Sequence, residues 1–414
     1  MTEKMKPSGI DYLGNIPVSW DAKRFKYCVQ ICNGGEYADI EVEEDGYPVI
    51  GSGGEFARAS KYCYRGESVL LGRKGTIDKP LYVNDAFWCV DTMFYTKAKQ
   101  GMIPKFLYYC ALCFRFDYYV TATALPSMTQ KDLGSEMIAV PPTDEQQAIA
   151  DLLDTQCAKI DSVIADIEKQ IETLQRYKKA LITEAVTKGL DRSVPMRDSG
   201  IDWIGEIPDH WDTNRLRYVA SVKTGPFGTQ LSADEYVDEG VPIINVKNIG
   251  YGSILAEDLD FVPETVADRL SVHRLKIDDI VFGRKGAVDK HAIITDEYVD
   301  WVQGSDCIRV RSNPEIDSGY LNYLFDSTYF GSYVMLYAVG STMPSMSSDI
   351  LLNARILVPP VHEQRQIAAY LNNQCRKMNG IITNKQAQLD IIRQHKKSLI
   401  HEYVTGKKRV TEVN

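Results

Sequence analysis

Residues 140–150 read Val-Pro-Pro-Thr-Asp-Glu-Gln-Gln-Ala-Ile-Ala, and residues 358–368 read Val-Pro-Pro-Val-His-Glu-Gln-Arg-Gln-Ile-Ala. In each stretch two prolines stop an apolar, strand-like run, and a long pattern of helical spacing follows. The two junctions lie 218 residues apart (358 minus 140). The chain therefore contains one strand-to-helix junction twice, which indicates a duplicated domain, each copy followed by a long helix.

The rest of the chain repeats around these junctions. Residues 8–20 contain Ser8-Gly9-Ile10-Asp11, Gly14, Ile16-Pro17 and Trp20, which return as Ser199-Gly200-Ile201-Asp202, Gly205, Ile207-Pro208 and Trp211; Gly72-Arg73-Lys74-Gly75 returns as Gly283-Arg284-Lys285-Gly286, and Pro126-Ser127-Met128 as Pro344-Ser345-Met346. The shift grows along the chain, so the copies share a frame and differ by insertions. A period of this length is too long for a solenoid and predicts two domains related by a pseudo-two-fold axis.

Two long amphipathic helices are predicted, over residues 143–189 and about 361–406. Apolar residues recur there at steps of three and four, or at sums of such steps. The first stripe comprises Ile149, Leu153, Ile160, Ile164, Ile167, Ile171, Leu174, Leu181 and Ala185, and the second Ile367, Leu371, Met378, Ile382, Leu389, Ile392, Leu399 and Tyr403. Thr143 with Gln146 predicts a capping box at the start of the first helix, and Gly189 a stop at its end.

The two helices are predicted to pair with each other in antiparallel orientation. Neither is stable alone in water with a bare apolar stripe, and a two-fold axis perpendicular to the pair makes it antiparallel. The first half of the first helix is acidic and the last part of the second is basic, which favours the same orientation. The seam is imperfect, because Lys385 occupies the position equivalent to Ile167. We predict an α+β protein with two globular domains joined by two long antiparallel helices.

Composition sets broad limits on the kind of protein. With 414 residues, 44% of them apolar and 25% charged, the chain resembles an ordinary globular protein of two domains. We find no apolar run long enough for a membrane span and no signal-like start. Nine cysteines, an odd number, favour reduced thiols in the cytoplasm. Cys110 and Cys113 have zinc-like spacing, but their apolar surroundings favour buried packing.

The chain lacks the sequence motifs of common enzymes. It contains neither a Gly-x-x-x-x-Gly-Lys-Ser/Thr phosphate loop, nor a metal-binding histidine pair at helical spacing, nor a Gly-x-Ser-x-Gly elbow. Asn313-Pro314-Glu315 also differs from the Asn-Pro-Pro-aromatic motif by which adenine methyltransferases hold their target base. We therefore expect a non-catalytic chain without a metal site, whose chemistry is recognition.

The repeated Gly-Arg-Lys-Gly segments are the first candidate nucleic-acid contacts. Each puts two cations, Arg73 and Lys74 or Arg284 and Lys285, between glycines directly after an apolar strand. Glycines such as Gly75 and Gly286 let backbone approach a phosphate closely, and the cations neutralise its charge. The net charge of −9 does not argue against this, because local patches decide affinity for phosphate. A basic turn with a purely structural role remains the alternative.

Further candidates lie in loops. Amides and cations at residues 223–230 and 245–248 suit base edges or phosphates. The candidates are Lys223, Thr229, Gln230, Asn245, Lys247 and Asn248, together with Ser52 in the matching turn of the first copy. Ordinary loops remain the alternative for all of them, and residues 51–54 are interpreted as a tight, glycine-permitted turn. Residues 127–130 and 345–348 favour helix caps after a proline turn over base readers.

The motifs together resemble a known family. The Ser-Gly-Ile-Asp-x-x-Gly-x-Ile-Pro-x-x-Trp frame, the Val-Pro-Pro-x-x-Glu-Gln-x-x-Ile-Ala junction, and residues 179–190 (Lys-Ala-Leu-Ile-Thr-Glu-Ala-Val-Thr-Lys-Gly-Leu) resemble the specificity (S) subunit of type I restriction-modification systems. The resemblance covers essentially the whole chain. It implies that residues 1–142 and 191–360 are target recognition domains, each for one half of a gapped double-stranded DNA sequence, and that residues 143–190 and 361–414 form the spacer helices and tail.

The resemblance also implies partners in a bacterial or archaeal cytoplasm. The helices would dock two modification (methyltransferase) subunits, and restriction (motor-nuclease) subunits would complete the complex. S-adenosylmethionine, ATP and Mg would belong to those partners, with no cofactor in this chain. Two alternatives stay open: a pseudo-dimeric coiled-coil scaffold that binds proteins, and a fused methyltransferase, which the missing target-base motif disfavours.

Overall fold

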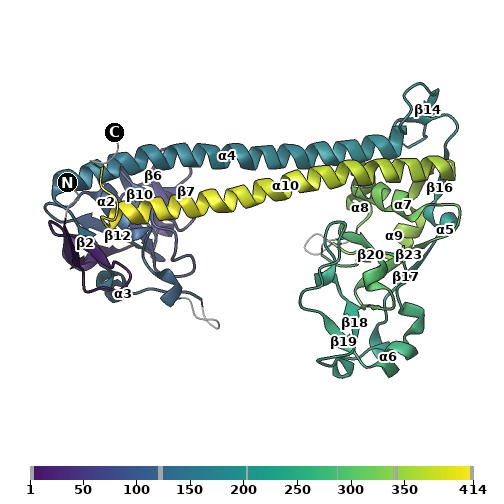
Figure 1. Ribbon diagram of the computed structural model, residues 1–414, viewed down its shortest axis with the longest axis horizontal. Coiled ribbons are helices and arrows are strands. Elements are labelled where there is room, and N and C mark those ends of the chain that lie inside the picture. The colour runs from purple at the N-terminus through teal and green to yellow at the C-terminus, as the bar shows by residue number, and fades with distance from the viewer. Residues whose placement is uncertain are drawn as a thin grey trace. The chain divides into compact units, whose positions relative to one another are not determined.

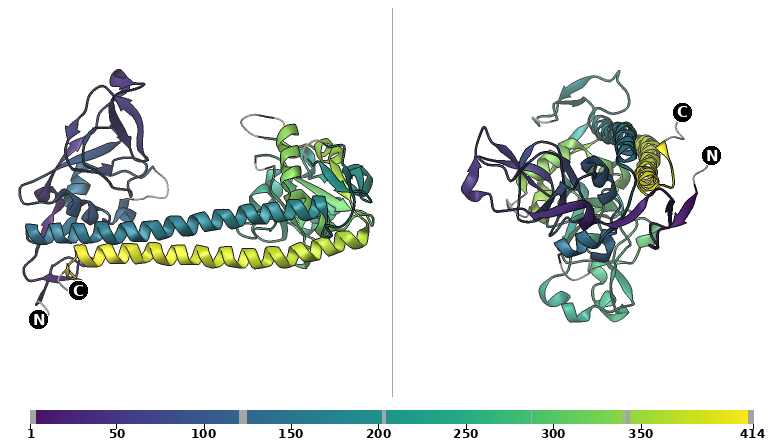
Figure 2. Two further views of the ribbon diagram at one scale, coloured as in Figure 1. Left: turned by 90° about the horizontal axis from the view of Figure 1, so that it is seen from above. Right: turned by 90° about the vertical axis from the view of Figure 1, so that its left-hand side faces the viewer.

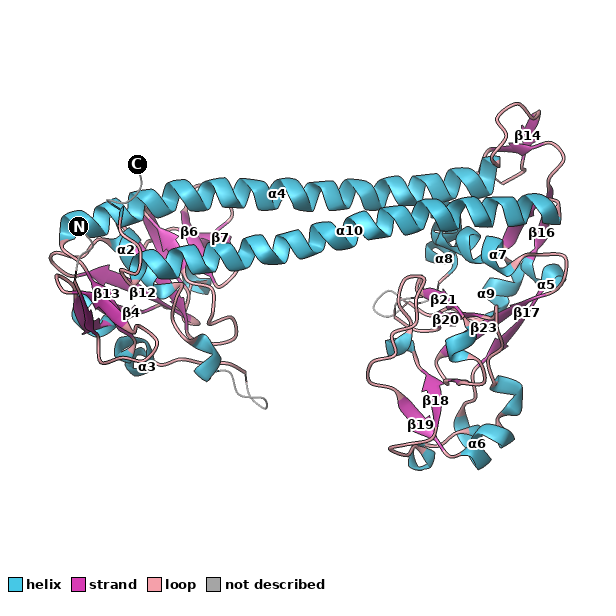
Figure 3. Cartoon of the chain, viewed as in Figure 1, coloured by secondary structure: helices cyan, strands magenta, loops and turns pink. Residues whose placement is uncertain are grey.

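The computed structural model describes residues 4–119, 125–201, 204–286, 288–338, 340 and 344–410. They form two compact units: unit 1 comprises Met1–Glu168 and Gln386–Asn414, and unit 2 comprises Lys169–Lys385 (Figure 1). Each unit contains one α+β domain and part of each long helix, as Figure 3 shows by element type. The predicted fold class is confirmed. The units divide within the helices rather than at their ends, because each helix packs against both domains at its two ends.

The long helices are α4, Thr143–Lys188, and α10, Val361–Val404. In unit 1, Lys396 Nζ lies 2.6 Å from Asp161 Oδ1, and in unit 2 Lys178 Nζ donates to Asn379 Oδ1 at 2.9 Å. Low numbers on one helix thus meet high numbers on the other in both units, so the predicted antiparallel pairing is confirmed (Figure 2). Lys385, at the imperfect position of the seam, donates to Gln170 Oε1 at 2.5 Å.

The predicted stripes face inward. On α4, Ile149, Leu153, Ile167, Ile171 and Ala185 are buried and Ile160, Ile164, Leu174 and Leu181 are half-buried; on α10, Ile367, Leu371, Met378, Leu389, Leu399 and Tyr403 are buried and Ile382 and Ile392 are half-buried. The acidic start of α4 also lies beside basic residues of α10, since Arg393 Nη2 is 2.7 Å from Glu168 Oε1.

Unit 1 is built on two sheets. The four-stranded sheet has the order β10 (Leu81–Val83), β9 (Ser68–Gly72), β12 (Met93–Ala98), β4 (Val29–Asn33), and the five-stranded sheet the order β5 (Glu41–Val42), β7 (Gly54–Ala59), β6 (Tyr47–Gly51), β11 (Ala86–Cys89), β8 (Tyr64–Arg65). Two strand pairs, β1 (Met5–Pro7) with β2 (Asn15–Pro17) and β3 (Asp21–Arg24) with β13 (Met137–Val140), and the helices α1 (Phe25–Cys28), α2 (Pro104–Ala111) and α3 (Gln130–Ser135) complete it, with short 3₁₀ turns at Ala38–Ile40 and Phe116–Tyr119.

Unit 2 follows the same plan with a smaller second sheet. Its four-stranded sheet has the order β17 (Ala220–Thr224), β23 (Cys307–Ser312), β20 (Ile280–Gly283), β21 (His291–Ile293), and its three-stranded sheet the order β19 (Asp260–Val262), β18 (Val241–Ile244), β22 (Val302–Gln303). The strand pairs are β14 (Met196–Asp198) with β15 (Glu206–Pro208) and β16 (Asp212–Arg215) with β24 (Arg355–Val358). The helices are α5 (Leu216–Val219), α6 (Glu264–Arg269), α7 (Ser318–Asp326), α8 (Thr328–Tyr337) and α9 (Ser348–Asn353), with 3₁₀ turns at Gly228–Gln230, Ala233–Glu235, Val246–Asn248, Ser271–His273 and Asp296–Tyr298.

The repeated tryptophan and glutamate anchor each domain to the start of a long helix. Trp20 is fully buried, and its indole Nε1 donates to Glu145 Oε2 at 3.0 Å. Trp211 is equally buried and donates to Glu363 Oε2 at 2.9 Å. A buried indole N–H needs an acceptor, and the first turn of the helix supplies one in both units. This contact explains why the tryptophan and the Pro-Pro-x-x-Glu junction repeat together.

The predicted capping box of Thr143 and Gln146 is wrong. Gln146 is buried, and its side-chain amide donates to Gly101 O at 3.1 Å and accepts from Ile103 N at 3.0 Å. Thr143 Oγ1 also donates to Gly101 O. The loop before α2 brings its own unpaired backbone groups to the helix start, and the glutamine satisfies those instead. Gln364 in unit 2 does the same, binding the backbone at Glu315 and Asp317.

A glycine that follows the C-terminal end of each long helix lies against a tryptophan ring. The predicted stop at Gly189 is confirmed: its φ is +73°, and an added Cβ would lie 3.1 Å from Trp211. In unit 1, Gly406 follows the end of α10 with φ +72°, and an added Cβ would lie 3.2 Å from Trp20. Arg409 Nη2 then reaches Glu145 Oε1 at 2.7 Å. Each domain core therefore joins the start of one long helix to the end of the other.

Candidate nucleic-acid interface

Three loops meet at one edge of the four-stranded sheet in unit 1. β9 ends at Gly72, which pairs with Met93 at the start of β12, and β4 ends at Asn33, which pairs with Phe94. Since β12 is antiparallel to both neighbours, the loops after β9 and β4 and the loop before β12 share this edge. The Arg73-Lys74 pair and the residues after Asn33 are thus brought together. We call this end of the sheet, where the strands β9 and β4 end and β12 begins, the loop edge.

Unit 2 repeats this loop edge. β20 ends at Gly283 opposite Cys307, and β17 ends at Thr224 opposite Ile308. Arg284 and the loop after β17 therefore converge, and the Arg284 guanidinium lies 5.5 Å from the centre of the Phe227 ring. The candidates at residues 223–230 and 283–286, which are far apart in the chain, belong to one surface.

The two repeated loop motifs form one structural module. In unit 1, Met128 N donates to Arg73 O at 3.0 Å and Gly75 N to Pro126 O at 2.8 Å. In unit 2 the same bonds join Met346 to Arg284 and Gly286 to Pro344, each at 2.9 Å. Gly75 and Gly286 have φ of +78° and +76°, which favours glycine. The module fixes the backbone, and three of its four cationic side chains, those of Arg73, Lys74 and Lys285, are exposed.

The serine and threonine residues after these motifs cap helices, as predicted. Thr129 Oγ1 accepts from Asp132 N at 3.2 Å at the start of α3, in a capping box. Ser347 Oγ accepts from Ile350 N at 3.3 Å at the start of α9. In each unit the module is therefore followed directly by a short helix with a capped N-terminus, α3 or α9.

The cations of the module differ in their surroundings. Lys74 is exposed, and Arg73 is exposed while its guanidinium donates to Asp91 O at 3.2 Å. Lys285 is exposed and its Nζ lies 3.2 Å from Asp306 Oδ1, and Arg284 is half-buried. The contacts of Arg73 and Lys285 lie at the surface, and a phosphate can replace them at little cost.

The flanking candidates of unit 2 lie at the same edge. Gln230 is exposed in the 3₁₀ turn Gly228–Gln230. Lys223 is half-buried in β17, and its carbonyl accepts from Gln303 Nε2 at 2.9 Å. The side chain of Thr229 lies outside the described residues, as does the repeated Asp202.

The loop after β18 is stabilised by its own polar residues. Asn248 is fully buried; its Oδ1 accepts from Asn245 N at 3.1 Å and its Nδ2 donates to Leu255 O at 3.2 Å. This amide is not available to a base edge, so Asn248 does not fit the predicted role. Asn245 Nδ2 donates to Asp260 Oδ2 at 2.7 Å. Lys247 is exposed, and its hydrogen bond to Asp258 raises its pKa.

Ser52 lies in the tight turn between β6 and β7, as predicted. Gly51 pairs with Gly54 across the turn, and Gly54 has φ of +102°. Ser52 is half-buried. It belongs to the five-stranded sheet rather than to the four-stranded sheet that carries Arg73.

The sequence analysis missed a glycine in each copy that shapes the loop edge. A Cβ added to Gly34 would lie 1.9 Å from Val90 O, and one added to Gly225 would lie 1.8 Å from Gly304 O. The backbone just after β11 in unit 1, and just after β22 in unit 2, thus passes where any other residue would place its side chain. The signal was present, since the two glycines are separated by the same shift as Trp20 and Trp211.

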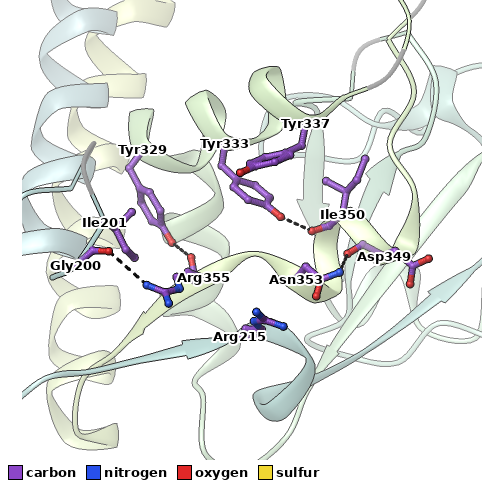
Figure 4. Close-up of a pocket in the computed structure, with 10 residues that line it drawn as sticks. All are labelled: Gly200, Ile201, Arg215, Tyr329, Tyr333, Tyr337, Asp349, Ile350, Asn353 and Arg355. Atoms are coloured by element: carbon purple, nitrogen blue, oxygen red, sulfur yellow. Dashed lines mark hydrogen bonds between the residues drawn. The ribbon is translucent and has the colours of Figure 1, made fainter.

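A pocket of about 580 Å³ opens on unit 2 (Figure 4). Tyr329, Tyr333 and Tyr337 of α8 form one wall, and Arg215 and Arg355 lie on the strand pair β16–β24. The Tyr333 hydroxyl donates to Ile350 O at 2.8 Å, and that of Tyr329 donates to Arg355 O. The pocket therefore combines aromatic faces with cationic groups.

Among the described residues, no group of three or more His, Cys, Asp or Glu side chains is placed to hold a metal ion. Cys110 is buried in the core of unit 1, and Cys113 packs against the same core. Burial raises the pKa of the Cys113 thiol to about 12, as expected for a packing residue. In the same portion of the chain, none of the helices combines the length and apolarity that crossing a membrane requires.

Two α+β domains, each with a cation-bearing loop module at the same sheet edge, define a duplicated recognition protein. The family model for the type I restriction modification DNA specificity domain matches residues 17–173 and 208–390, and the chain belongs to this family.

Individual relatives support the assignment. The MjaVIII specificity subunit of Methanocaldococcus jannaschii is 29% identical over 297 residues, which covers 70% of this chain and 67% of that protein. The MjaIX specificity subunit of the same organism is 22% identical over 97% of this chain and 96% of its own length. A chain from a solved structure of a type I R-M system is 13% identical with a TM-score of 0.66, over 95% of this chain and 99% of that one, and shares the fold.

Proposed function

We propose that this chain is the DNA specificity subunit of a type I restriction-modification complex, and that each domain recognises one half of a bipartite, gapped DNA target. The observation that supports this most strongly is the recurrence of the Arg-Lys-Gly module at the same sheet edge in both units, within a chain that matches the specificity-domain model twice. The surrounding loops differ between the units, as two different half-sites require.

The module supplies contacts that position the chain on DNA. Arg73, Lys74, Arg284 and Lys285 would bind phosphates, which fixes register without reading sequence. Neighbouring polar side chains such as Gln230 would meet base edges in the groove. With a net charge of −9, the chain alone would bind DNA weakly and with strong salt dependence. Partner subunits would supply further surface around the DNA.

The paired helices would set the separation of the two readers. Two readers on one face of B-DNA lie about 10 base pairs apart, and a continuous helix pair suits a fixed spacing. The helices would also dock two modification subunits, with restriction subunits joining them. S-adenosylmethionine, ATP and Mg would be bound by those partners, and the target adenine would be flipped into a partner's pocket. This chain would position the reaction without catalysing it.

The function is tested by mapping methylated adenines genome-wide in cells with and without the gene. A gapped, two-part motif should disappear on deletion and return on complementation. Replacing residues 199–360 with those of another family member should change one half of that motif only. An unchanged methylation pattern would favour the alternative, a coiled-coil scaffold that binds proteins.

The module itself is tested with charge-removing variants of the complex. Arg284→Ala with Lys285→Ala should weaken DNA binding and reduce its salt dependence by about two phosphate contacts. Lys276→Ala, at an exposed position before β20 and so at the end of that strand opposite the module, is the control and should leave both unchanged. The chain alone, mixed with labelled S-adenosylmethionine and DNA, should transfer no methyl group.

A further inference from the structure

An exposed tyrosine recurs at the same position of both units. Tyr27 on α1 and Tyr218 on α5 are each 62% exposed. Each of these short helices buries its first and last residues, Phe25 and Cys28 or Leu216 and Val219. The tyrosines point away from the core, so packing does not explain why the same large aromatic side chain occurs twice.

Exposed cations flank each tyrosine. Arg24 and Lys26 precede Tyr27, and Arg215 and Arg217 precede Tyr218, all of them exposed. We name the surface of Arg24, Lys26 and Tyr27 the α1 patch, and that of Arg215, Arg217 and Tyr218 the α5 patch. The two patches present the same chemistry: one phenol beside two positive charges.

The patches are separate from the loop edge. In unit 1, β4 begins at Val29, directly after the α1 patch, and ends at Asn33 at the loop edge. A strand rises about 3.3 Å per residue, so the patch and the Arg73 module lie at opposite ends of the strand. In unit 2, β17 separates the α5 patch from the loop edge in the same way. The phosphate-binding role proposed for the module therefore does not account for the patches.

Positive charge extends around both patches. In unit 1, Lys99 Nζ donates to Lys26 O at 2.8 Å, and Lys26 Nζ lies 5.2 Å from the centre of the Tyr27 ring. Lys23 is also exposed, with Asp21 at 3.4 Å as its carboxylate neighbour.

In unit 2 the charge continues into the tyrosine-walled pocket. Arg215 and Arg355 are paired in the register of β16 and β24 and both line that pocket, together with Asp349 (Figure 4). Arg217 Nη2 donates to Asn353 Oδ1 at 2.6 Å, which ties the guanidinium to the end of α9.

We infer that each patch docks an acidic face of a partner protein, one copy of the partner on each unit. Tyrosine and arginine are the residues enriched at protein-interface hot spots, where a rigid ring supplies contact area and the cation supplies a charged hydrogen bond. Identical chemistry on both units suits a partner that is the same on both, whereas the DNA half-sites differ. The inference rests on the proposed function, in which that partner is the modification subunit, and it adds the two patches to the helices as docking surface.

The test counts partner copies on the full-length chain. The chain is co-expressed with the modification subunit of its own system, and the complex is weighed by native mass spectrometry. Tyr27→Ala and Tyr218→Ala should each lose about one of the two copies at concentrations where the wild type is saturated, because loss of a hot spot weakens binding about 30-fold. The double variant should lose both. Lys26→Glu and Arg217→Glu should have the same effects by charge reversal.

Matched controls are Tyr118→Ala in unit 1 and Tyr251→Ala in unit 2. Both tyrosines are at least as exposed, at 68% and 69%. The controls should keep two partner copies. Melting temperatures of all variants should match the wild type, because none of these side chains is buried.

Two outcomes overturn the inference. The double variant could retain both partner copies at wild-type affinity, or partner binding could persist while DNA binding by the chain alone falls, which would assign the patches to DNA phosphate. Failure of the proposed function looks different: the wild-type chain would then show no gapped methylation motif and no partner binding to lose.

Discussion

At the start of β9 unit 1 has a buried hydroxyl group, and at the equivalent position directly before β20 unit 2 has a buried carboxylate. Ser68 Oγ donates to Thr96 O at 2.7 Å on the four-stranded sheet. Asp279 takes the equivalent place in unit 2 and is fully buried, with its oxygens 2.6 and 2.7 Å from Nε and Nη2 of Arg311. One sheet position thus carries a neutral bond in one copy and an ion pair in the other.

A position on the adjacent strand also holds an uncharged residue in unit 1 and a charged one in unit 2. Tyr95 of β12 pairs with Cys32 in unit 1, and Arg309 of β23 pairs with Lys223 in unit 2. Burial, followed by the nearby Arg311, lowers the pKa of Arg309, whereas the hydrogen bond that Arg311 donates to Asp279 raises the pKa of Arg311. The shared frame therefore resides in the backbone register and in glycines such as Gly34 and Gly225. The side chains at equivalent sheet positions, such as Ser68 and Asp279, can therefore differ in charge between the units.

The largest expected effect comes from breaking the ion pair. Asp279→Ala would leave Arg309 and Arg311 without their carboxylate and should destabilise unit 2 by about 3–5 kcal/mol. Ser68→Ala removes one neutral hydrogen bond and should cost unit 1 about 1 kcal/mol. Urea unfolding followed by hydrogen-exchange mass spectrometry, with separate peptides from each unit, measures both.

The control for that experiment replaces three residues of unit 2 with the residues that unit 1 has at the equivalent positions. The triple variant Asp279→Ser, Arg309→Tyr, Arg311→Lys should be more stable than Asp279→Ala, because the buried charge of Arg309 is removed together with the carboxylate. If the single variant is as stable as Ser68→Ala, the two sheets do not differ energetically at this position.

Acid should lower the stability of unit 2 through a buried histidine. His273 in unit 2 is buried, and this burial beside Lys223 and Arg309 lowers its pKa to about 4. The unfolded chain protonates histidine near pH 6.5. Between these values the unfolded state binds the extra proton, so stability falls as pH drops from about 6.5 to 4, by at most about 3 kcal/mol.

The variant His273→Gln isolates this contribution. Its stability difference from the wild type should shift in its favour as pH falls through that window and stay constant above pH 7. Chemical denaturation at pH 7.5 and pH 4.5, with hydrogen exchange reporting on β23, measures the shift. A pH-independent difference would show that His273 is protonated in the folded unit.

The glycines of the loop edge should respond alike in the two units. Gly34→Ala and Gly225→Ala would each place a Cβ within 2 Å of a carbonyl oxygen, so each should destabilise its own unit by about 1–3 kcal/mol. Gly53→Ala and Gly331→Ala are controls, since nothing lies within 4 Å of either added Cβ. A harmless substitution at one of the two loop-edge glycines would show that the frame is less symmetric than the backbone indicates.

The sequence was sufficient for the parts of the molecule that repeat. The junctions at Pro141 and Pro359, the stripe periodicity, and the charge pattern predicted two α+β domains and an antiparallel helix pair. Local signals were also enough for the caps at Thr129 and Ser347. These features depend on neighbours in the chain or on a second copy of the same pattern.

Long-range polar contacts could not be predicted. Gln146 looked like half of a capping box, but it binds a loop that precedes it by more than 40 residues. Asn248 looked like a loop residue facing solvent, yet its amide is used by the backbone of the following segment. Lys247 is likewise paired with Asp258, which lies 11 residues away. The sequence alone does not show whether a polar side chain in a loop binds water, nucleic acid or the loop itself.

The smallest expected effect concerns one contact that the helix pair makes twice. Lys396 meets Asp161 in unit 1 and its equivalent Lys178 meets Asn379 in unit 2, so one copy is an ion pair and the other a neutral bond. Asn379→Asp should make the contacts alike and stabilise unit 2 by less than about 1 kcal/mol, because exposed ion pairs contribute little. The gain should vanish at 1 M salt, where the Debye length is about 3 Å. Asp161→Asn should cost unit 1 a similar, equally salt-sensitive amount. Urea unfolding of both variants at 0.05 and 1 M NaCl measures this, and a gain that survives high salt would mean that geometry, and not charge, distinguishes the two contacts.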